Sequence, residues 1–89
     1  MELTTQTWTV ELLLSERDGV THAEARLHSG VPTPLTASGE ARLSLHDPLD
    51  VAEIGYELAA ARALTHLGEA LLQTAGADVD ALLRESRHG

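Results

Sequence analysis

An Asp-Gly pair at positions 18 and 19 separates two segments in which apolar and polar residues alternate. Alternation with a period of two is typical of a strand with one buried face, and Asp-Gly supplies the two positive φ angles of a tight hairpin turn. The sequence therefore predicts antiparallel strands over residues 7–15 and 21–29. Pairing Arg17 with Val20 puts apolar opposite apolar and Glu11 opposite Arg26. The inner face then carries Trp8, Val10, Leu12, Leu14, Ala23, Ala25 and Leu27.

A third alternating segment covers residues 35–45, after a loop that contains two prolines. Its inner residues are Ala37, Gly39, Ala41, Leu43 and Leu45. We expect Arg26 to face Glu40 and Glu24 to face Arg42, because this register satisfies both faces of the sheet. The outer face would then carry a charged row across three strands, Glu11–Arg26–Glu40.

The outer face of this predicted sheet is balanced in charge. A solvent-facing ladder is its default interpretation, and a docking surface for a protein partner is the alternative. The residues concerned are His22, Glu24, Arg26, His28, Glu40 and Arg42.

A long run with helical periodicity follows over residues 48–75. Asp47 can cap it with Pro48 at the first helical position, and Asp50 with Glu53 is an alternative capping pair. Gly76 is expected to end this helix, and residues 78–86 are expected to form a short second helix or to continue the first after a kink. The stripe predicted to face the sheet is Val51, Ile54, Leu58, Ala61, Thr65, Gly68 and Leu72.

These elements predict an α+β fold in one domain, residues 1–89. A three-stranded antiparallel meander sheet is covered on one face by a long C-terminal helix, and a short terminal helix follows. Ala and Gly dominate the middle of the sheet and recur on the helix, as at Ala61 and Gly68. Small residues on both sides would let the two backbones approach closely.

The predicted helix is longer than the strands that it covers. Residues 51–75 span roughly 37 Å as a helix, whereas a nine-residue strand spans about 30 Å. The excess leucines need a cover, which the tail helix, a second subunit or both could supply. They are Leu64, Leu67, Leu71 and Leu72. With one Trp, one Tyr and no Phe, the core is thin, and we expect a homodimer.

Charge and composition exclude several functions. The net charge is −8 and no Lys is present, which argues against nucleic acid and against an anionic membrane surface. The chain has no Cys, its start lacks the pattern of a signal peptide, and its apolar runs are too short to span a membrane. We expect a cytoplasmic protein.

No residue set indicates catalysis, a cofactor or a metal. His22 and His28 share a strand face but lie about 20 Å apart, too far to chelate one ion. The acidic pairs Asp47/Asp50 and Glu53/Glu57 are explained by the helix dipole and a solvated helix face. His46, beside the helix entrance, is the histidine of most interest, although a cap region accounts for it.

Four segments together resemble a known family: TWTVEL, THAEARLHSG, LTASGEARLS and DPLDVAEIGYELAAARALTHLGEALL. They are similar to a family of small conserved actinobacterial proteins of unknown function, over about residues 6–75. The resemblance implies a fold like that of the double-stranded-RNA-binding domain without its first helix, and no established activity. It also implies a link to stress or dormancy programmes. RNA-binding members of that fold carry Lys where this chain has Asp47, Asp50, Glu53 and Glu57.

The leading hypothesis is a non-enzymatic protein that acts through protein–protein contacts. One alternative is a nucleic-acid-associated module, which the acidic charge disfavours. Another is small-ligand binding in a dimer cleft near His46.

Overall fold

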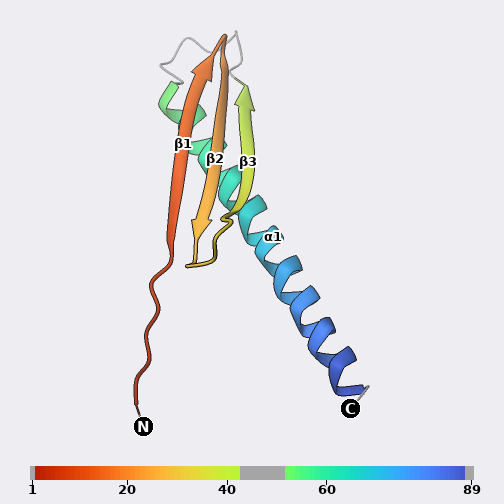
Figure 1. Ribbon diagram of the computed structural model, residues 1–89. Coiled ribbons are helices and arrows are strands. Elements are labelled where there is room, and N and C mark those ends of the chain that lie inside the picture. The colour runs from red at the N-terminus through yellow and green to blue at the C-terminus, as the bar shows by residue number, and fades with distance from the viewer. Residues whose placement is uncertain (1, 43–51, 88–89) are drawn as a thin grey trace.

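The computed structural model describes residues 2–42 and 52–87. Three strands precede one helix: β1 (Thr9–Arg17), β2 (Val20–His28), β3 (Leu35–Arg42) and α1 (Ala52–Arg87). The strands form one antiparallel sheet in the order β1-β2-β3, and α1 crosses one of its faces (Figure 1). This arrangement confirms the predicted α+β fold. The predictions for the end of the third strand, for Leu43 and Leu45, and for the caps at Asp47, Pro48 and Asp50 lie outside the described residues.

The hairpin between β1 and β2 follows its sequence signal. Asp18 and Gly19 have φ angles of 53° and 76°, which is the left-handed pair that the tight turn requires. The strands pair from Arg17 opposite Val20 to Thr9 opposite His28. The predicted register is therefore confirmed, although β1 begins and ends two residues later than expected and β2 covers Val20–His28 instead of 21–29.

The register between β2 and β3 was predicted wrongly. Glu40 lies opposite His22 and Ser38 opposite Glu24, so β3 is displaced by four residues from the expected pairing. A displacement of four keeps every side chain on its predicted face. The expected and observed registers both keep apolar residues on the inner face, so they differ in the charge pairs of the outer face. Each exposed pair contributes less than about 1 kcal/mol. Packing on the inner face determines the β2–β3 register instead.

That packing centres on Gly39, which lies opposite Ala23 in the sheet. A Cβ atom at Gly39 would lie 2.5 Å from the amide nitrogen of Ala63 and 2.7 Å from the carbonyl oxygen of Ala59. The helix backbone thus touches the strand directly, and only glycine fits between them. The predicted close approach of helix and sheet is correct for Gly39 but not for Gly68, which has nothing within 4 Å.

The rotation of α1 about its axis differs from the prediction. Its buried residues are spaced by four along the helix: Gly55, Ala59, Ala63 and Leu67. Every described member of the predicted sheet-facing stripe is exposed: Ile54, Leu58, Ala61, Thr65, Gly68 and Leu72. The reason is steric, because a leucine would hold the helix away from Gly39 whereas alanine permits backbone contact.

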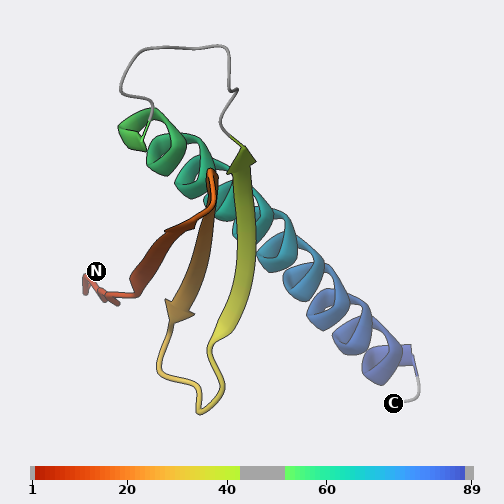
Figure 2. The ribbon, with the colours of Figure 1, turned by 90° about the horizontal axis from the view of Figure 1, so that it is seen from above.

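The helix is continuous through Gly76, so the predicted break and separate helix at 78–86 are wrong. Gly76 has open space around it and no positive φ angle. At 36 residues α1 is roughly 54 Å long, and its core contacts end at Leu71. The radius of gyration is 18.2 Å, against roughly 12 Å for a compact chain of this length. The C-terminal half of α1 projects beyond the sheet (Figures 1 and 2).

The core between sheet and helix is small. Its buried apolar residues are Ala23, Ala25, Leu27, Ala41, Ala59, Ala63 and Leu67. Thr21 is also fully buried, and within the described residues its hydroxyl has no hydrogen-bond partner. Five of the seven core residues are alanine, so hydrophobic burial alone stabilises this fold weakly.

Within residues 2–42 and 52–87, no helix has the length and hydropathy that a lipid bilayer span requires.

Two glycine substitutions test this packing. Gly39→Ala should lower the free energy of unfolding by about 1–3 kcal/mol, because the new methyl group meets helix backbone. Gly76→Ala should raise it by about 1 kcal/mol, because alanine favours a continuous helix. Urea unfolding at one protein concentration measures both. Destabilisation by Gly76→Ala would show that the helix ends there.

Candidate functional site

The inner side of β1 is left uncovered by the helix. α1 packs over β3 and β2 and barely touches β1, and Figure 2 shows β1 curving away from the helix axis. Val10, Leu12 and Leu14, called here the β1 inner row, are 44, 37 and 44% exposed. These residues sit opposite the buried residues of β2, so they share the core face without being enclosed.

The free edge of β1 adds hydrogen-bonding capacity to this surface. β1 is the first strand of the sheet, and no other strand pairs with its far side within the described part of the chain. An edge strand exposes unpaired backbone N–H and C=O groups, which readily pair with another extended segment. An apolar row beside an open edge is the usual form of a strand-binding surface.

A groove of about 680 Å³ lies at one end of the sheet, below the β1 inner row. Trp8 borders it from the residue before β1, and Leu71 borders it from the helix. The Trp8 indole Nε1 donates to the Gln6 side-chain oxygen at 3.0 Å, which ties the N-terminal segment to the rim. This end groove is lined by Gln6, Trp8, Leu27, Ser29, Val31, Thr33, Pro34, Leu35, Leu71, Thr74, Ala75 and Asp78.

The four leucines predicted as an interface do not form one surface. Leu67 is buried against the sheet, and Leu71 is half-buried beside it. Leu64 is exposed on the helix, and Leu72 is 75% exposed. The rotation that packs the helix alanines against the sheet places Leu67 in the core.

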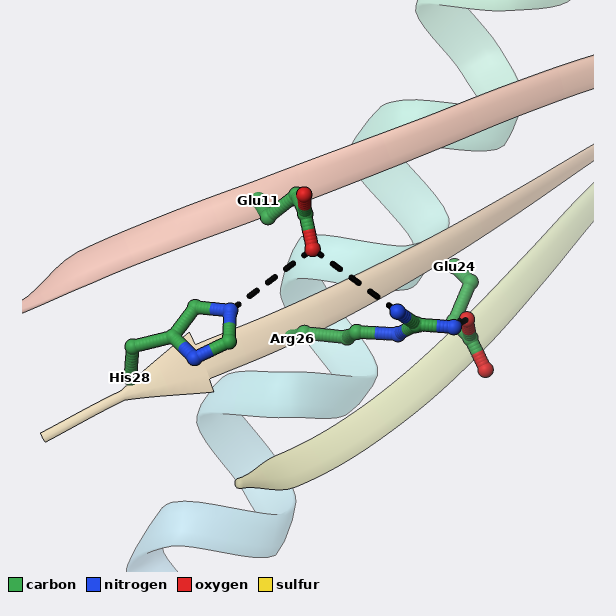
Figure 3. A network of polar contacts seen from close by, with 4 residues as sticks. All are labelled: Glu11, Glu24, Arg26 and His28. Atoms are coloured by element: carbon green, nitrogen blue, oxygen red, sulfur yellow. Dashed lines mark hydrogen bonds and ion pairs between the residues drawn. The ribbon is translucent and has the colours of Figure 1, made fainter. Parts of the chain in front are cut away.

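The outer face of the sheet holds an ion-pair network around Arg26 (Figure 3). The Arg26 Nη2 and Nε atoms lie 2.7 and 2.9 Å from Glu24 Oε2. Glu11 Oε1 lies 3.8 Å from Arg26 Nη1 and 3.6 Å from His28 Nε2, so it connects β1 to two residues of β2. The predicted contact of Glu11 with Arg26 is present.

The predicted continuation of this row to β3 is absent because of the register. Glu40 lies 3.7 Å from His22 Nδ1 instead of beside Arg26, and Arg42 lies opposite Val20 instead of Glu24. The paired side chains are all more than a third exposed. Water and salt weaken such pairs, so the outer face is a solvated polar ladder.

Two helix residues that sequence reasoning passed over fasten α1 to β3. Arg62 Nη1 donates to the Glu40 carbonyl at 2.6 Å, and His66 Nδ1 lies 2.6 Å from the Ser38 carbonyl oxygen. Arg62 and His66 are one helical turn apart, so they lie on one side of the alanine stripe. Their spacing indicates contact with β3 only once it is known which face of the helix packs on the sheet.

The described residues hold no cluster of side chains suited to a metal ion. Among residues 2–42 and 52–87, no three His, Asp or Glu side chains lie close enough together to hold a metal ion. Glu53 and Glu57 are exposed on the first turns of the helix. His46 and the Asp47/Asp50 pair lie outside the described residues.

Sheet, helix and uncovered apolar surfaces define a small α+β protein of the three-strand, one-helix type. The chain belongs to the Rv2632c-like family, whose model matches residues 6–88. The expected membership of an actinobacterial family of unknown function is thereby confirmed.

Its similarity to mycobacterial proteins extends over most of both chains. The uncharacterized protein Mb1767 of Mycobacterium bovis is 40% identical over 80 residues, covering 90% of this chain and 83% of the relative. The uncharacterized protein Rv2632c of Mycobacterium tuberculosis is 41% identical over 78 residues, covering 85 and 80%. The crystal structure of Rv2632c superposes with a TM-score of 0.79 at 36% identity, covering 91% of this chain and 94% of that one. These relatives establish family and fold, and the activity has to be argued from the surfaces.

The weak contribution of the outer-face ion pairs to the stability of the fold can be tested directly. Arg26→Gln removes the centre of the network, and it should lower the free energy of unfolding by less than about 1 kcal/mol. Added salt should shrink the difference further. Arg17→Gln serves as control, since the described part of the chain shows no ion pair for Arg17. A loss above about 2 kcal/mol at Arg26 would contradict a solvated ladder.

Proposed function

We propose that this protein acts in the cytoplasm without catalytic chemistry, by binding an extended segment of another protein along β1. The observation that carries the proposal is the β1 inner row, which stays exposed beside an open strand edge. Monomeric proteins normally cover or charge such an edge. The charges of β1 are Glu11, Glu16 and Arg17. Its inner row presents valine and leucine without a cover, which favours a binding role.

The binding mode follows from the geometry of a strand. A segment that pairs with β1 would satisfy its free backbone groups, and every second side chain of that segment would lie over the inner face. Val10, Leu12 and Leu14 would then be covered from the side that α1 leaves open. The end groove continues this surface past Trp8, and its volume lies within the range of small-molecule sites.

Charge indicates the character of the partner. The protein carries a net charge of −8 and has no Lys, so its field attracts basic partners and repels nucleic acid. Opposite charge mainly increases the rate of association. We therefore infer an apolar, extended segment flanked by basic residues, on a protein and not on RNA.

Two adjacent leucines provide a matched test. Leu12 belongs to the inner row and is 37% exposed, whereas Leu13 points to the outer face and is 41% exposed. Leu12→Lys should abolish capture of the partner, and Leu13→Lys should retain it, because only the first places a charge on the binding side. Affinity capture from the host with both variants and the parent, read by quantitative mass spectrometry, measures this.

The control for folding is the far-ultraviolet circular dichroism spectrum of both variants. A captured protein that Leu12→Lys and Leu13→Lys lose equally, or that both retain, would contradict binding on the inner side of β1.

A second candidate function is binding of a small apolar molecule in the end groove, which its volume and lining favour. Trp8 is the one tryptophan of the chain and borders the groove, so its fluorescence reports occupancy. Titration with the neutral dye Nile red should shift Trp8 emission saturably, and Val31→Asp should weaken binding. Leu3→Asp is the control, because Leu3 is exposed away from the groove. An equal effect of both substitutions would exclude the groove.

A further inference from the structure

The outward side of α1 carries a stripe of mostly apolar residues along nearly its whole length. Its members recur at alternating steps of four and three residues, which is the 3.5-residue period of a coiled-coil seam. They are Ile54, Leu58, Ala61, Thr65, Gly68, Leu72, Ala75, Val79, Leu82 and Ser86. We call this stripe the helix seam. It covers 32 residue steps, or roughly 48 Å.

Every residue of the helix seam is exposed. The sheet occupies the opposite side of α1, through Ala59 and Ala63. The two hydroxyl residues in the seam are already satisfied within the helix, since Thr65 donates to the Ala61 carbonyl at 2.8 Å and Ser86 to the Leu83 carbonyl at 3.1 Å. The seam can therefore be buried without leaving a hydroxyl donor unpaired.

The projecting half of α1 needs such a cover to be stable. Beyond Leu71, where core contacts end, some sixteen residues continue as helix to Arg87. An isolated helix of this length is marginal in water, and Gly76 lowers its helical preference by a further 1 kcal/mol or so. Val79 and Leu82 are 54 and 66% exposed on this part, so an apolar partner would stabilise it.

We propose that the helix seam binds the helix seam of a second copy of this protein, with the two helices antiparallel and the two-fold axis between Thr65 and Gly68. The 3.5-residue period indicates a helix as the occupant, because only another helix matches that spacing over this length. About this axis small residues meet large ones: Ala61 faces Leu72 of the second copy, and Leu58 faces its Ala75. Thr65 faces Gly68 of the second copy at the centre, where the helices approach most closely.

Charges beside the seam favour this register. Arg62 and Glu69 flank the seam on one side, seven residues apart. In the antiparallel arrangement Arg62 of each copy lies next to Glu69 of the other, which gives two reciprocal ion pairs. Moving the axis by one layer, to between Gly68 and Leu72, would instead place Glu69 of one copy against Glu69 of the other. Glu57 and Asp78 meet as like charges on the other side, away from the axis.

The assembly is compatible with the rest of the fold. Because the sheet and the seam lie on opposite sides of α1, the two sheets lie outside the helix pair and do not collide. The β1 inner row stays open in the pair. Dimer formation through the seam and partner binding at β1 can therefore be tested independently.

Sedimentation velocity of the full chain tests the pairing. The parent protein should sediment as a dimer, with twice the 9.5 kDa chain mass. Leu72→Glu should weaken the dimer by more than about 100-fold, because two unpaired carboxylates would be buried at the interface. Leu72 is 75% exposed in the single chain, so its own fold should survive, as circular dichroism will verify.

Leu13→Glu is the matched control, since it puts the same charge on the exposed sheet edge. It should leave the dimer intact. A monomeric parent protein at about 100 µM would overturn the proposal, and so would a dimer that Leu13→Glu dissociates and Leu72→Glu does not.

Charge reversal tests the register. Glu69→Arg should weaken the dimer, because it places Arg62 of each copy against an arginine of the other, and adding Arg62→Glu should restore it. Because Arg62 also donates to the Glu40 carbonyl, the double variant is compared with Arg62→Glu alone, which loses the same bond and should dimerise more weakly than the double variant. No restoration in the double variant would overturn the antiparallel register.

Spin labelling tests the direction of the helices. The chain has no native cysteine, so Ser86→Cys carries one label per copy near the end of the seam. The antiparallel pair places the two labels roughly 60 Å apart, and double electron–electron resonance should report that distance. A separation near 10–20 Å, as parallel helices would give, would overturn the proposal.

Discussion

The contact between Gly39 and the backbone of α1 at Ala59 and Ala63 is the constraint on which the rest of this structure depends. It requires a residue without a Cβ atom on β3 and alanine on the helix. The contact therefore determines which face of α1 packs against the sheet. Arg62 and His66 then reach the carbonyl groups of β3 and hold that rotation. Because the alanine stripe faces the sheet, the larger aliphatic residues of α1 must face outward. The thin core and the exposed helix seam are two results of one steric requirement.

Local features of the fold could be predicted from the sequence, and features set by packing could not. The Asp18–Gly19 hairpin is encoded by two adjacent residues and an alternating pattern, so its register was predicted correctly. The helix has two apolar stripes, and hydrophobicity alone favours the one with Leu58 and Leu72. The structure uses the other, because backbone proximity at Gly39 outweighs side-chain size. The same contact sets the β2–β3 register against weak charge pairs on the outer face.

For the candidate surfaces too, local features could be predicted from the sequence and features set by packing could not. Sequence reasoning located the polar outer face and its Glu11–Arg26 contact, but it grouped leucines that the helix rotation separates. It placed the β1 inner row on the inner face but did not predict that the row stays exposed, because an alternating strand gives no sign of whether a helix covers it. In the structure α1 covers two strands of three and projects past the sheet, which leaves two apolar surfaces on different elements. One suits an extended segment and the other suits a helix. Ala75 belongs to the helix seam and also lines the end groove, while the β1 inner row and the seam share no residue.

The central claim is that the projecting half of α1 is held by a second copy and not by its own sheet. Amide hydrogen exchange along the helix at several protein concentrations tests it most directly. Amides of residues 74–87 should lose protection on dilution from about 100 µM to about 1 µM, as the dimer dissociates, while those of β2 and of residues 59–67 should keep theirs. Protection of residues 74–87 that is independent of concentration, or absent at every concentration, would contradict it.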